Sequence, residues 1–389
     1  MKIQRVIQAE LLDSAGEYPV VTVLGPRQSG KTTLVQMAFP DKTYRLLEDP
    51  DVRRLATEDP RGFFAECPDG AIIDEVQRVP SLLSYIQGIV DADDTPGKFI
   101  LTGSHQPELH QAVSQTLAGR TAILNLLPFS FTEMLNFKKR WNALHLCCSG
   151  SFPRLQVRKL KPQRFYAGYL QTYVERDVRS LVNIKDLGRF QAFIRLLAGR
   201  AGQLVNYSAL SNDVGVSSTT IKTWVDVLKA SFVVFELQPY FENVRKRLIK
   251  SPKIYFTDVG LVCFLLGIHS ADQLSRDPLR GGLYENLIIL EVLKNRLNHG
   301  HRPTLFFYRD SHGNEVDLVI QNGSRLQPVE IKSAETFSPD FIKGIRNFRD
   351  TVGDKSDSGI VIYNGKEEYH FKGIHILNPL RHGGFELCD

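Results

Sequence analysis

The octapeptide GPRQSGKT, at residues 25–32, fits the pattern G-x-x-x-x-G-K-[ST] without a mismatch. In that pattern, successive backbone N–H groups surround phosphate oxygens, and the N-terminus of the following helix adds a partial positive charge. An apolar run at residues 20–24 predicts a buried strand before the octapeptide, and residues 33–38 predict the first turns of a helix after it. Strand, glycine-rich loop and helix are the context that the pattern requires, so the stretch predicts a phosphate-binding loop.

The residue types in this loop suit separate tasks. Gly25 and Gly30 permit unusual backbone torsions and a close approach of the backbone to phosphate. Lys31 is expected to reach the β- and γ-phosphates of a nucleotide, and the Thr32 hydroxyl is expected to hold Mg²⁺. ATP and Mg²⁺ are therefore the predicted cofactors. The predicted nucleotide contacts come from Gly25, Pro26, Arg27, Gln28, Ser29, Gly30, Lys31, Thr32 and Thr33.

Two carboxylates end a later apolar run, at residues 71–75. Asp74 is predicted to hold Mg²⁺, and Glu75 is predicted to be the general base for the water that attacks the γ-phosphate. An arginine commonly meets the charge that develops during phosphoryl transfer. Arg120 is the first candidate for this role, and the alternatives are Arg154, Arg176 and, within the loop itself, Arg27.

Short apolar runs alternate with helical patterns up to about residue 135. This alternation predicts an α/β domain with a parallel sheet and helices on both faces. An amphipathic helix is predicted over residues 1–18, ahead of the first strand. The predicted strands are 20–24, 43–47, 71–75, 99–104 and 123–127.

Six segments together resemble the prokaryotic AAA-type ATPases of the archaeal-ATPase branch, which pair an ATPase module with a C-terminal domain of unknown function. The resemblance spans nearly the whole chain and implies ATP binding more directly than ATP turnover. It also implies that Ser104 is the polar sensor residue of the site, with Thr102 as the alternative. The segments are GPRQSGKTTL, EDPDVRRLATEDPRGF, AIIDEVQRVPSLL, FILTGSHQ, LAGR and LLPFSFTE.

The middle of the chain has the spacing of a helix-turn-helix, at residues 205–228. Residues 232–237 and 253–256 are expected to form a wing beside it. The second helix carries one lysine near its start, so it offers few side chains that could contact DNA bases. The densest basic cluster follows, with Arg245, Lys246, Arg247, Lys250 and Lys253, and it is a candidate for contacts with nucleic-acid phosphates. A structural lid or self-association module is the alternative.

Four residues in the C-terminal part form a candidate catalytic set. Glu285 lies on a predicted helix, Asp317 on a predicted strand, and Glu330 and Lys332 on the next strand. Asp317 and Glu330 would hold Mg²⁺, and Lys332, on the same strand face as Glu330, would orient or activate water for attack on a phosphodiester. The set resembles the PD-(D/E)XK nuclease superfamily in residue types and order. The alternative is a cross-strand ion pair at a sheet surface.

Composition sets further limits. No apolar run approaches the roughly 18–20 residues that span a bilayer, and residues 1–10 lack a signal-peptide core, so a cytoplasmic protein without a membrane partner is expected. Five scattered cysteines without C-x-x-C spacing argue against a zinc site or a disulfide framework. The net charge of +5 permits DNA as a partner without requiring it. Self-association also stays open.

The 389 residues predict two or three domains, at roughly 100–200 residues each. We assign an AAA-type P-loop ATPase domain to residues 1–160, a winged-helix-like helical domain to 161–275 and a PD-(D/E)XK nuclease-like domain to 276–389. The leading hypothesis is an ATP-hydrolysing protein that couples its nucleotide state to a nuclease-like, DNA-interacting domain. The alternative is a nucleotide-dependent regulatory switch whose C-terminal domain is catalytically inactive.

Overall fold

The computed structural model describes residues 3–104, 113, 115–137, 141–174, 186–241 and 251–382. Contacts divide the chain into two compact units. The first consists of Met1–Phe129, Ala230–Phe232 and Arg296–His301, and the second consists of Ser130–Lys229, Val233–Asn295 and Arg302–Asp389. The octapeptide therefore belongs to the first unit, and the predicted C-terminal catalytic set belongs to the second.

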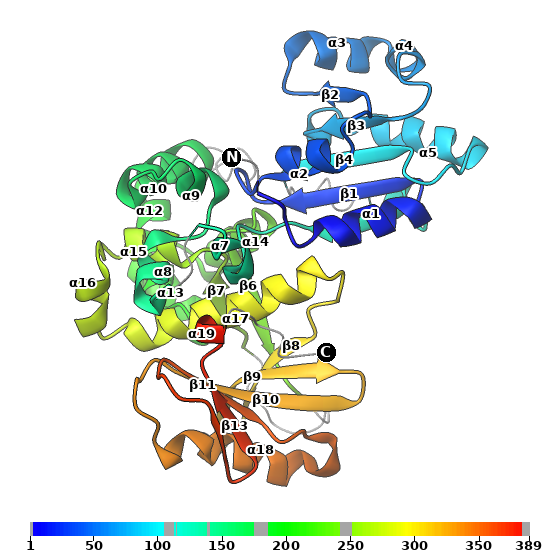
Figure 1. Ribbon diagram of the computed structural model, residues 1–389. Coiled ribbons are helices and arrows are strands. Elements are labelled where there is room, and N and C mark those ends of the chain that lie inside the picture. Colours follow the sequence, from blue (N-terminus) through cyan, green and yellow to red (C-terminus); the bar gives the residue numbers. More distant parts are fainter. Residues whose placement is uncertain are drawn as a thin grey trace. The chain divides into compact units, whose positions relative to one another are not determined.

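The first unit is built on a five-stranded sheet of the described residues, in the order β2-β3-β4-β1-β5 (Figure 1). All neighbouring strands in it are parallel, and β1 lies between β4 and β5. Every residue of β1 is buried, as expected for a strand that is covered on both faces. The predicted parallel α/β sheet is confirmed. Its strands are β1 (Val20–Gly25), β2 (Tyr44–Leu46), β3 (Ala71–Asp74), β4 (Phe99–Ser104) and β5 (Thr121–Asn125).

Two hydrophobic clusters cover opposite faces of this sheet, because alternate residues of each strand point to opposite sides. Val21 and Val23 of β1 belong to the cluster that includes Ile7 and Leu34, whereas Leu24 belongs to the other cluster. The first predicted helix starts at Gln8 rather than at residue 1. The helices are α1 (Gln8–Glu17), α2 (Lys31–Ala38), α3 (Pro50–Glu58), α4 (Pro60–Ala65), the 3-10 turn η1 (Val76–Arg78) and α5 (Leu82–Ala92).

The second unit contains a mixed sheet of eight described strands, in the order β12-β13-β11-β10-β9-β8-β6-β7. Strands β8, β9 and β10 are antiparallel neighbours, and β11 runs parallel to β10. The residues predicted to form a wing make the antiparallel pair β6 and β7, but β6 also pairs in parallel with β8. The β6–β7 pair thus extends the C-terminal sheet, which the sequence did not predict. The strands are β6 (Val234–Pro239), β7 (Lys253–Phe256), β8 (Leu305–Arg309), β9 (Glu315–Asn322), β10 (Arg325–Lys332), β11 (Ile360–Tyr363), β12 (Tyr369–Phe371) and β13 (Ile374–Leu377).

Two helices of the second unit, α13 and α14, lie where the sequence predicts a helix-turn-helix. Asn206 caps α13, Gly215 ends it in the left-handed conformation, and the Ser217 hydroxyl accepts the Thr220 N–H at the start of α14. The helical elements are α7 (Phe131–Met134), α8 (Ala143–Ser149), α9 (Pro153–Val157), α10 (Pro162–Tyr169), the π-helix η2 (Leu170–Val174), α12 (Leu187–Ala198), α13 (Tyr207–Val214), α14 (Ser218–Ala230), α15 (Val259–Leu265), α16 (Ala271–Arg276), α17 (Arg280–Asn298), η3 (Pro339–Ile342), α18 (Lys343–Val352), η4 (Gly353–Lys355) and α19 (Pro379–His382).

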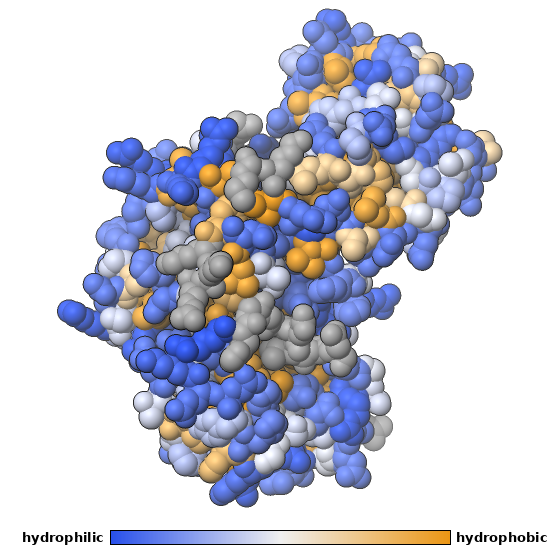
Figure 2. Space-filling model, viewed as in Figure 1, coloured by the Kyte–Doolittle hydropathy of each residue, from blue (hydrophilic) through white to orange (hydrophobic). Residues whose placement is uncertain are grey.

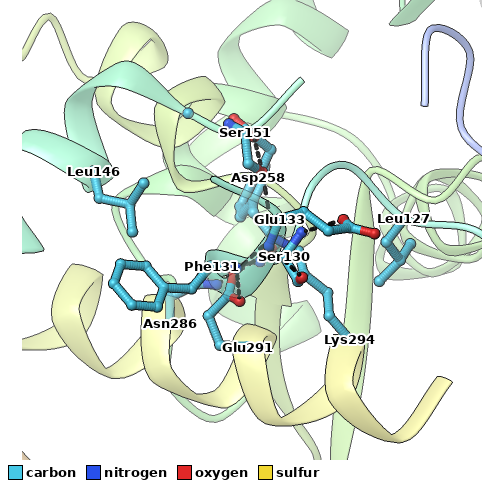
Figure 3. Close-up of polar contacts among 12 residues, drawn as sticks. Leu127, Ser130, Phe131, Glu133, Leu146, Ser151, Asp258, Asn286, Glu291 and Lys294 are labelled. Atoms are coloured by element: carbon cyan, nitrogen blue, oxygen red, sulfur yellow. Dashed lines mark hydrogen bonds and ion pairs between the residues drawn. The ribbon is translucent and has the colours of Figure 1, made fainter. Parts of the chain in front are cut away.

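A buried polar network anchors the long helix α17 within the second unit (Figure 3). The Glu291 carboxylate accepts the Phe131 N–H at 2.6 Å and the Lys294 ammonium at 2.8 Å. Lys294 also donates to the Ser151 hydroxyl, and Ser151 donates through its N–H and its hydroxyl to Asp258. Three segments that are distant in sequence therefore fix the position of α17, which carries Glu285.

The face drawn in Figure 2 is mostly hydrophilic, and its apolar residues lie in separate groups. Exposed large hydrophobic side chains, namely Leu12, Tyr85, Leu160 and Phe241, come from four distant parts of the chain. Scattered exposure of this kind is ordinary in folded proteins. In the described part of the chain, no helix combines the length and the apolar character that crossing a membrane requires.

Candidate functional site

The predicted phosphate-binding loop connects β1 to α2, and its two glycines are required for different reasons. A Cβ on Gly25 would lie 2.1 Å from the Leu126 carbonyl oxygen, so no larger residue fits there. Gly30 has φ of 96° and stands at the N-cap of α2, a left-handed conformation that glycine adopts most easily. Both glycines of the motif thus have a steric reason within the fold, and their close approach to phosphate stays a prediction.

Lys31 lies inside this loop. Its ammonium donates to the carbonyl oxygens of Gly25 and Pro26, at 3.0 Å each, and the side chain is buried. Burial lowers the pKa of Lys31, while the nearby Glu75 and Asp74 carboxylates oppose that effect. The ammonium is therefore held among loop carbonyls and acidic side chains, where the phosphates of a nucleotide are expected.

Asp74 ends β3 beside the start of α2. Its carboxylate accepts the Thr32 hydroxyl at 2.7 Å and the Tyr44 hydroxyl at 2.6 Å through the same oxygen, and it accepts the Thr102 hydroxyl through the other. Burial and the hydrogen bond to Asp74 raise the pKa of Tyr44, so Tyr44 stays a donor. The two predicted Mg²⁺ ligands, Thr32 and Asp74, are thus adjacent, and two further hydroxyls orient the carboxylate.

Glu75, the predicted base, adopts a left-handed conformation, with φ of 59° and ψ of 46°. Such torsions are strained for a residue with a Cβ and concentrate at functional sites. The Glu75 carboxylate accepts the Ser104 hydroxyl at 2.9 Å and the Gln77 amide. The structure therefore brings Ser104 to Glu75 and adds Gln77, which the sequence analysis missed.

Arg120 lies away from this site. It precedes β5, and its carbonyl accepts the Val20 N–H at the start of β1. The loop follows the opposite end of β1, which is six residues long, or about 20 Å at the usual rise of a strand. Arg120 forms an ion pair with Asp91 there, so it does not reach a nucleotide on its own chain.

Two other arginines, Arg27 and Arg78, lie at the edge of the sheet that carries the phosphate-binding loop. Arg78 follows Glu75 by three residues, and its guanidinium lies 3.5 Å from the Glu48 carboxylate, which also lies 3.9 Å from Arg27 of the loop. Sequence analysis missed Arg78 and Glu48. Of the remaining candidates, Arg154 belongs to α9 in the second unit, and Arg176 lies outside the described residues.

In the second unit, Asp317, Glu330 and Lys332 lie together as predicted. The Lys332 ammonium lies 2.5 Å from Glu330 Oε1 and 3.2 Å from Asp317 Oδ2, and Asp317 also accepts the Ile331 N–H. The other Glu330 oxygen, Oε2, is buried without a hydrogen-bond partner among the described residues. Burial and the nearby Asp317 raise the pKa of Glu330 to about 8. A buried oxygen of this kind fits a cation ligand.

Glu285 contacts a different lysine. Its carboxylate accepts the Lys253 ammonium at 3.1 Å and the Tyr255 hydroxyl at 2.5 Å. Burial and the negative charge of Asp317 raise the pKa of Glu285 to about 7. In the described ranges, no group of three or more His, Cys, Asp or Glu side chains is arranged to hold a metal ion. The pair Asp317 and Glu330 remains as the candidate.

Lys253 was predicted to belong to a basic cluster that contacts nucleic-acid phosphates, and this prediction is wrong. Its side chain is only 5% exposed and pairs with Glu285 and Glu315. β7 faces the interior at all four of its positions, which removes Lys253 from the surface. The other members of that basic cluster, within residues 242–250, lie outside the described part of the chain.

Comparison with known proteins divides the chain into three matched regions. Residues 17–135 match an AAA domain, residues 141–272 match a domain of unknown function (DUF8612), and residues 280–382 match another (DUF4143). The predicted ATPase domain and the C-terminal domain of unknown function are thus found. The nuclease resemblance and the predicted boundaries at residues 160 and 275 stay predictions.

Similar proteins include uncharacterized protein Rv2008c of Mycobacterium tuberculosis and uncharacterized protein Mb2031c of Mycobacterium bovis. Each is 32% identical over 392 residues, which cover 97% of this chain and 83% of the relative. Uncharacterized protein MJ1544 of Methanocaldococcus jannaschii is 21% identical over 397 residues, covering 93% of this chain and 85% of the relative.

Solved structures with similarity include the Walker-type ATPase PABY2304 of Pyrococcus abyssi, with a TM-score of 0.45 and 16% identity over 68% of this chain and 96% of that one. AMPPCP-bound DnaA from Aquifex aeolicus has a TM-score of 0.30 and 15% identity over 58% of this chain and 86% of that one. The full-length match to the mycobacterial relatives carries the assignment. The chain therefore belongs to the family of the mycobacterial protein Rv2008c, and its first unit contains a P-loop AAA-type ATPase domain.

Proposed function

We propose that this protein binds ATP with Mg²⁺ at residues 25–32, hydrolyses it with Glu75 as the base, and uses its nucleotide state to control a nuclease-like C-terminal site. One observation carries the nucleotide part. The Thr32 hydroxyl and the Asp74 carboxylate lie 2.7 Å apart at the start of α2, directly beside the loop that encloses Lys31. A hydroxyl and a carboxylate so placed fit the ligand set of Mg²⁺ in P-loop proteins.

Each residue of this site then has a separate task. The loop N–H groups and Lys31 bind the phosphates, and Thr32 and Asp74 hold the metal, with Tyr44 and Thr102 orienting Asp74. Bound Mg²⁺ neutralises charge on the β- and γ-phosphates. Glu75 takes the proton of the attacking water, and Ser104 sets the position of its carboxylate. Arg78, at the same edge, meets the charge that develops on the γ-phosphate.

Lys31→Ala tests the nucleotide assignment. We expect nucleotide binding to be lost and ATP turnover to fall at least about 100-fold, because a buried ammonium aimed at the phosphates stabilises charge far more than a solvated one. Turnover is measured by phosphate release, and binding by a fluorescent ATP analogue. Arg54→Ala is the control, since Arg54 forms an exposed ion pair with Asp51 on α3. Unchanged turnover in Lys31→Ala would refute the assignment.

For the second unit, we propose a site that cleaves phosphodiesters with a divalent ion. Asp317 and Glu330 hold the ion, and Lys332 orients the attacking water. The buried, unpartnered Glu330 Oε2 supports this role. DNA is the proposed substrate class, since α14 exposes Ser218, Thr219, Lys222 and Thr223 in a helix-turn-helix arrangement. The winged-helix and nuclease-like character of these parts belongs to the proposal.

A second function is favoured by a different observation. Lys332 pairs with both Asp317 and Glu330, so its ammonium already offsets part of their negative charge. These ion pairs also suit a structural network, in which case the chain is a nucleotide-dependent regulatory switch without cleavage activity.

Plasmid nicking with Mg²⁺ or Mn²⁺ separates these functions. If the site is catalytic, we expect wild type to nick and Asp317→Asn, which keeps the side-chain shape, to lose about 100-fold or more of that activity. Asp272→Asn, at an exposed position of α16, serves as the control. Nicking that survives Asp317→Asn would exclude this cluster, and a wild type that never nicks would favour the regulatory switch.

A further inference from the structure

The acidic cluster of the second unit is assembled from two of the matched regions. Lys253 and Tyr255 come from β7, within the middle match, whereas Glu285 and Glu315 come from the C-terminal match. The Lys253 ammonium lies 2.6 Å from the Glu315 carboxylate and 3.1 Å from that of Glu285. The middle region therefore contributes a cation to a cluster that sequence analysis assigned to the C-terminal domain alone.

The two lysines of this cluster, Lys253 and Lys332, differ in how freely their side chains can move. Lys253 is only 5% exposed, lies 5.5 Å from the centre of the Phe307 ring, and is anchored in the β6–β7 ladder opposite Leu237. The Lys332 side chain is 33% exposed. Both ammonium groups contact two carboxylates, but a partly solvated lysine that moves aside can exchange those contacts for water, whereas a buried lysine would leave its charge without a partner.

The carboxylates of this cluster also differ in how fully their oxygens are paired. Glu315 pairs with Lys253 and also lies 3.6 Å from Arg309, and Glu285 accepts both Lys253 and Tyr255. Glu330, by contrast, keeps one buried oxygen without a partner. Two-metal sites place their ions about 3.5–4 Å apart, so a second ion here would need the carboxylates that Lys253 already occupies.

We propose that Lys253 makes this cluster a single-cation site: its fixed ammonium takes the place of a second cation at Glu285 and Glu315, and one divalent ion binds at Asp317 and Glu330 after Lys332 moves aside. This inference rests on the proposed function, which places a divalent ion at those two residues. Lys253 is a positioning residue, since it acts through Glu285 and Glu315.

The test counts Mn²⁺ ions bound to the nucleotide-free full chain, by calorimetry and electron paramagnetic resonance. Ions of the acidic cluster are those that disappear when Asp317→Asn is combined with Glu285→Gln. We expect one such ion in wild type, two in Lys253→Met, and one again in Lys253→Arg, which restores the positive charge. Lys229→Met is the matched control, because Lys229 also bridges two carboxylates, Asp226 and Glu236, away from the cluster. It should keep one ion.

Two ions in the wild-type cluster would overturn the inference but would still support the proposed metal site. Because this count uses the wild-type protein, it does not depend on whether a lysine variant folds. A folded Lys253→Met that still binds one ion would overturn it as well. If no ion of the acidic cluster is found, the metal-binding part of the proposed function fails, and the inference fails with it.

Discussion

Glu75→Gln will bind ATP within a few-fold of the wild-type affinity and hydrolyse it at least about 100-fold more slowly. Glutamine keeps the shape of glutamate and can still contact Ser104 and Gln77, but it cannot take the proton of the attacking water. The loop, Lys31 and Asp74 are untouched by this change. Binding and turnover should therefore separate, which a loss of folding would not produce.

The measurement compares kcat for phosphate release with the Kd of a fluorescent ATP analogue. Glu58→Gln, at an exposed position of α3, removes the same charge without touching the site and should match wild type. A fall in kcat below about tenfold in Glu75→Gln would assign the base to another group. An equal loss of binding would show that Glu75 holds the nucleotide rather than activating water.

Lys294→Met should destabilise the second unit by about 3–5 kcal/mol, because it leaves the Glu291 carboxylate buried without its cation. Lys294 and Glu291 are only 2% and 3% exposed, and Figure 3 shows both within the network that holds Ser151 and Phe131. The double variant Lys294→Met with Glu291→Gln removes both charges. It should recover most of the lost stability, since the remaining amide can still accept the Phe131 N–H.

Denaturant unfolding followed by tryptophan fluorescence measures this effect. Trp141 and Trp224 both belong to the second unit, so their signal reports its unfolding free energy. Lys222→Met, on the exposed face of α14, is the control and should lie within about 0.5 kcal/mol of wild type. A loss under about 1 kcal/mol in Lys294→Met would mean that water or a neighbouring group compensates Glu291.

Much of the nucleotide site could be predicted from the sequence. The loop is one contiguous stretch, so its chemistry is local. Asp74 and Ser104 end two strands of a parallel sheet, and parallel strands bring their carboxyl ends to the edge where the loop lies. The partners Tyr44 and Gln77 were missed because sheet order and turn geometry decide which polar side chains meet at that edge.

Strand direction could have distinguished Arg78 from Arg120 on the basis of the sequence alone. A residue that precedes a strand of a parallel sheet lies at the edge opposite a residue that follows one. Arg120 precedes β5, and Arg78 comes shortly after β3. Strand direction, already predicted from the alternation of strands and helices, therefore favours Arg78 over Arg120 at the nucleotide.

By itself, the sequence determined the phosphate-binding loop, the parallel sheet around it and the grouping of Asp317, Glu330 and Lys332, because these depend on contiguous motifs and on strand alternation. Only the tertiary structure decided that the β6–β7 pair extends the C-terminal sheet and carries Lys253 into the acidic cluster. From sequence alone, a basic residue within a charged stretch is expected at the surface. The position of its strand in the fold can overturn that expectation, as it does for Lys253. Burial and ion pairing arise from contacts between residues distant in sequence, such as Lys253 and Glu315, which the order of residues does not reveal.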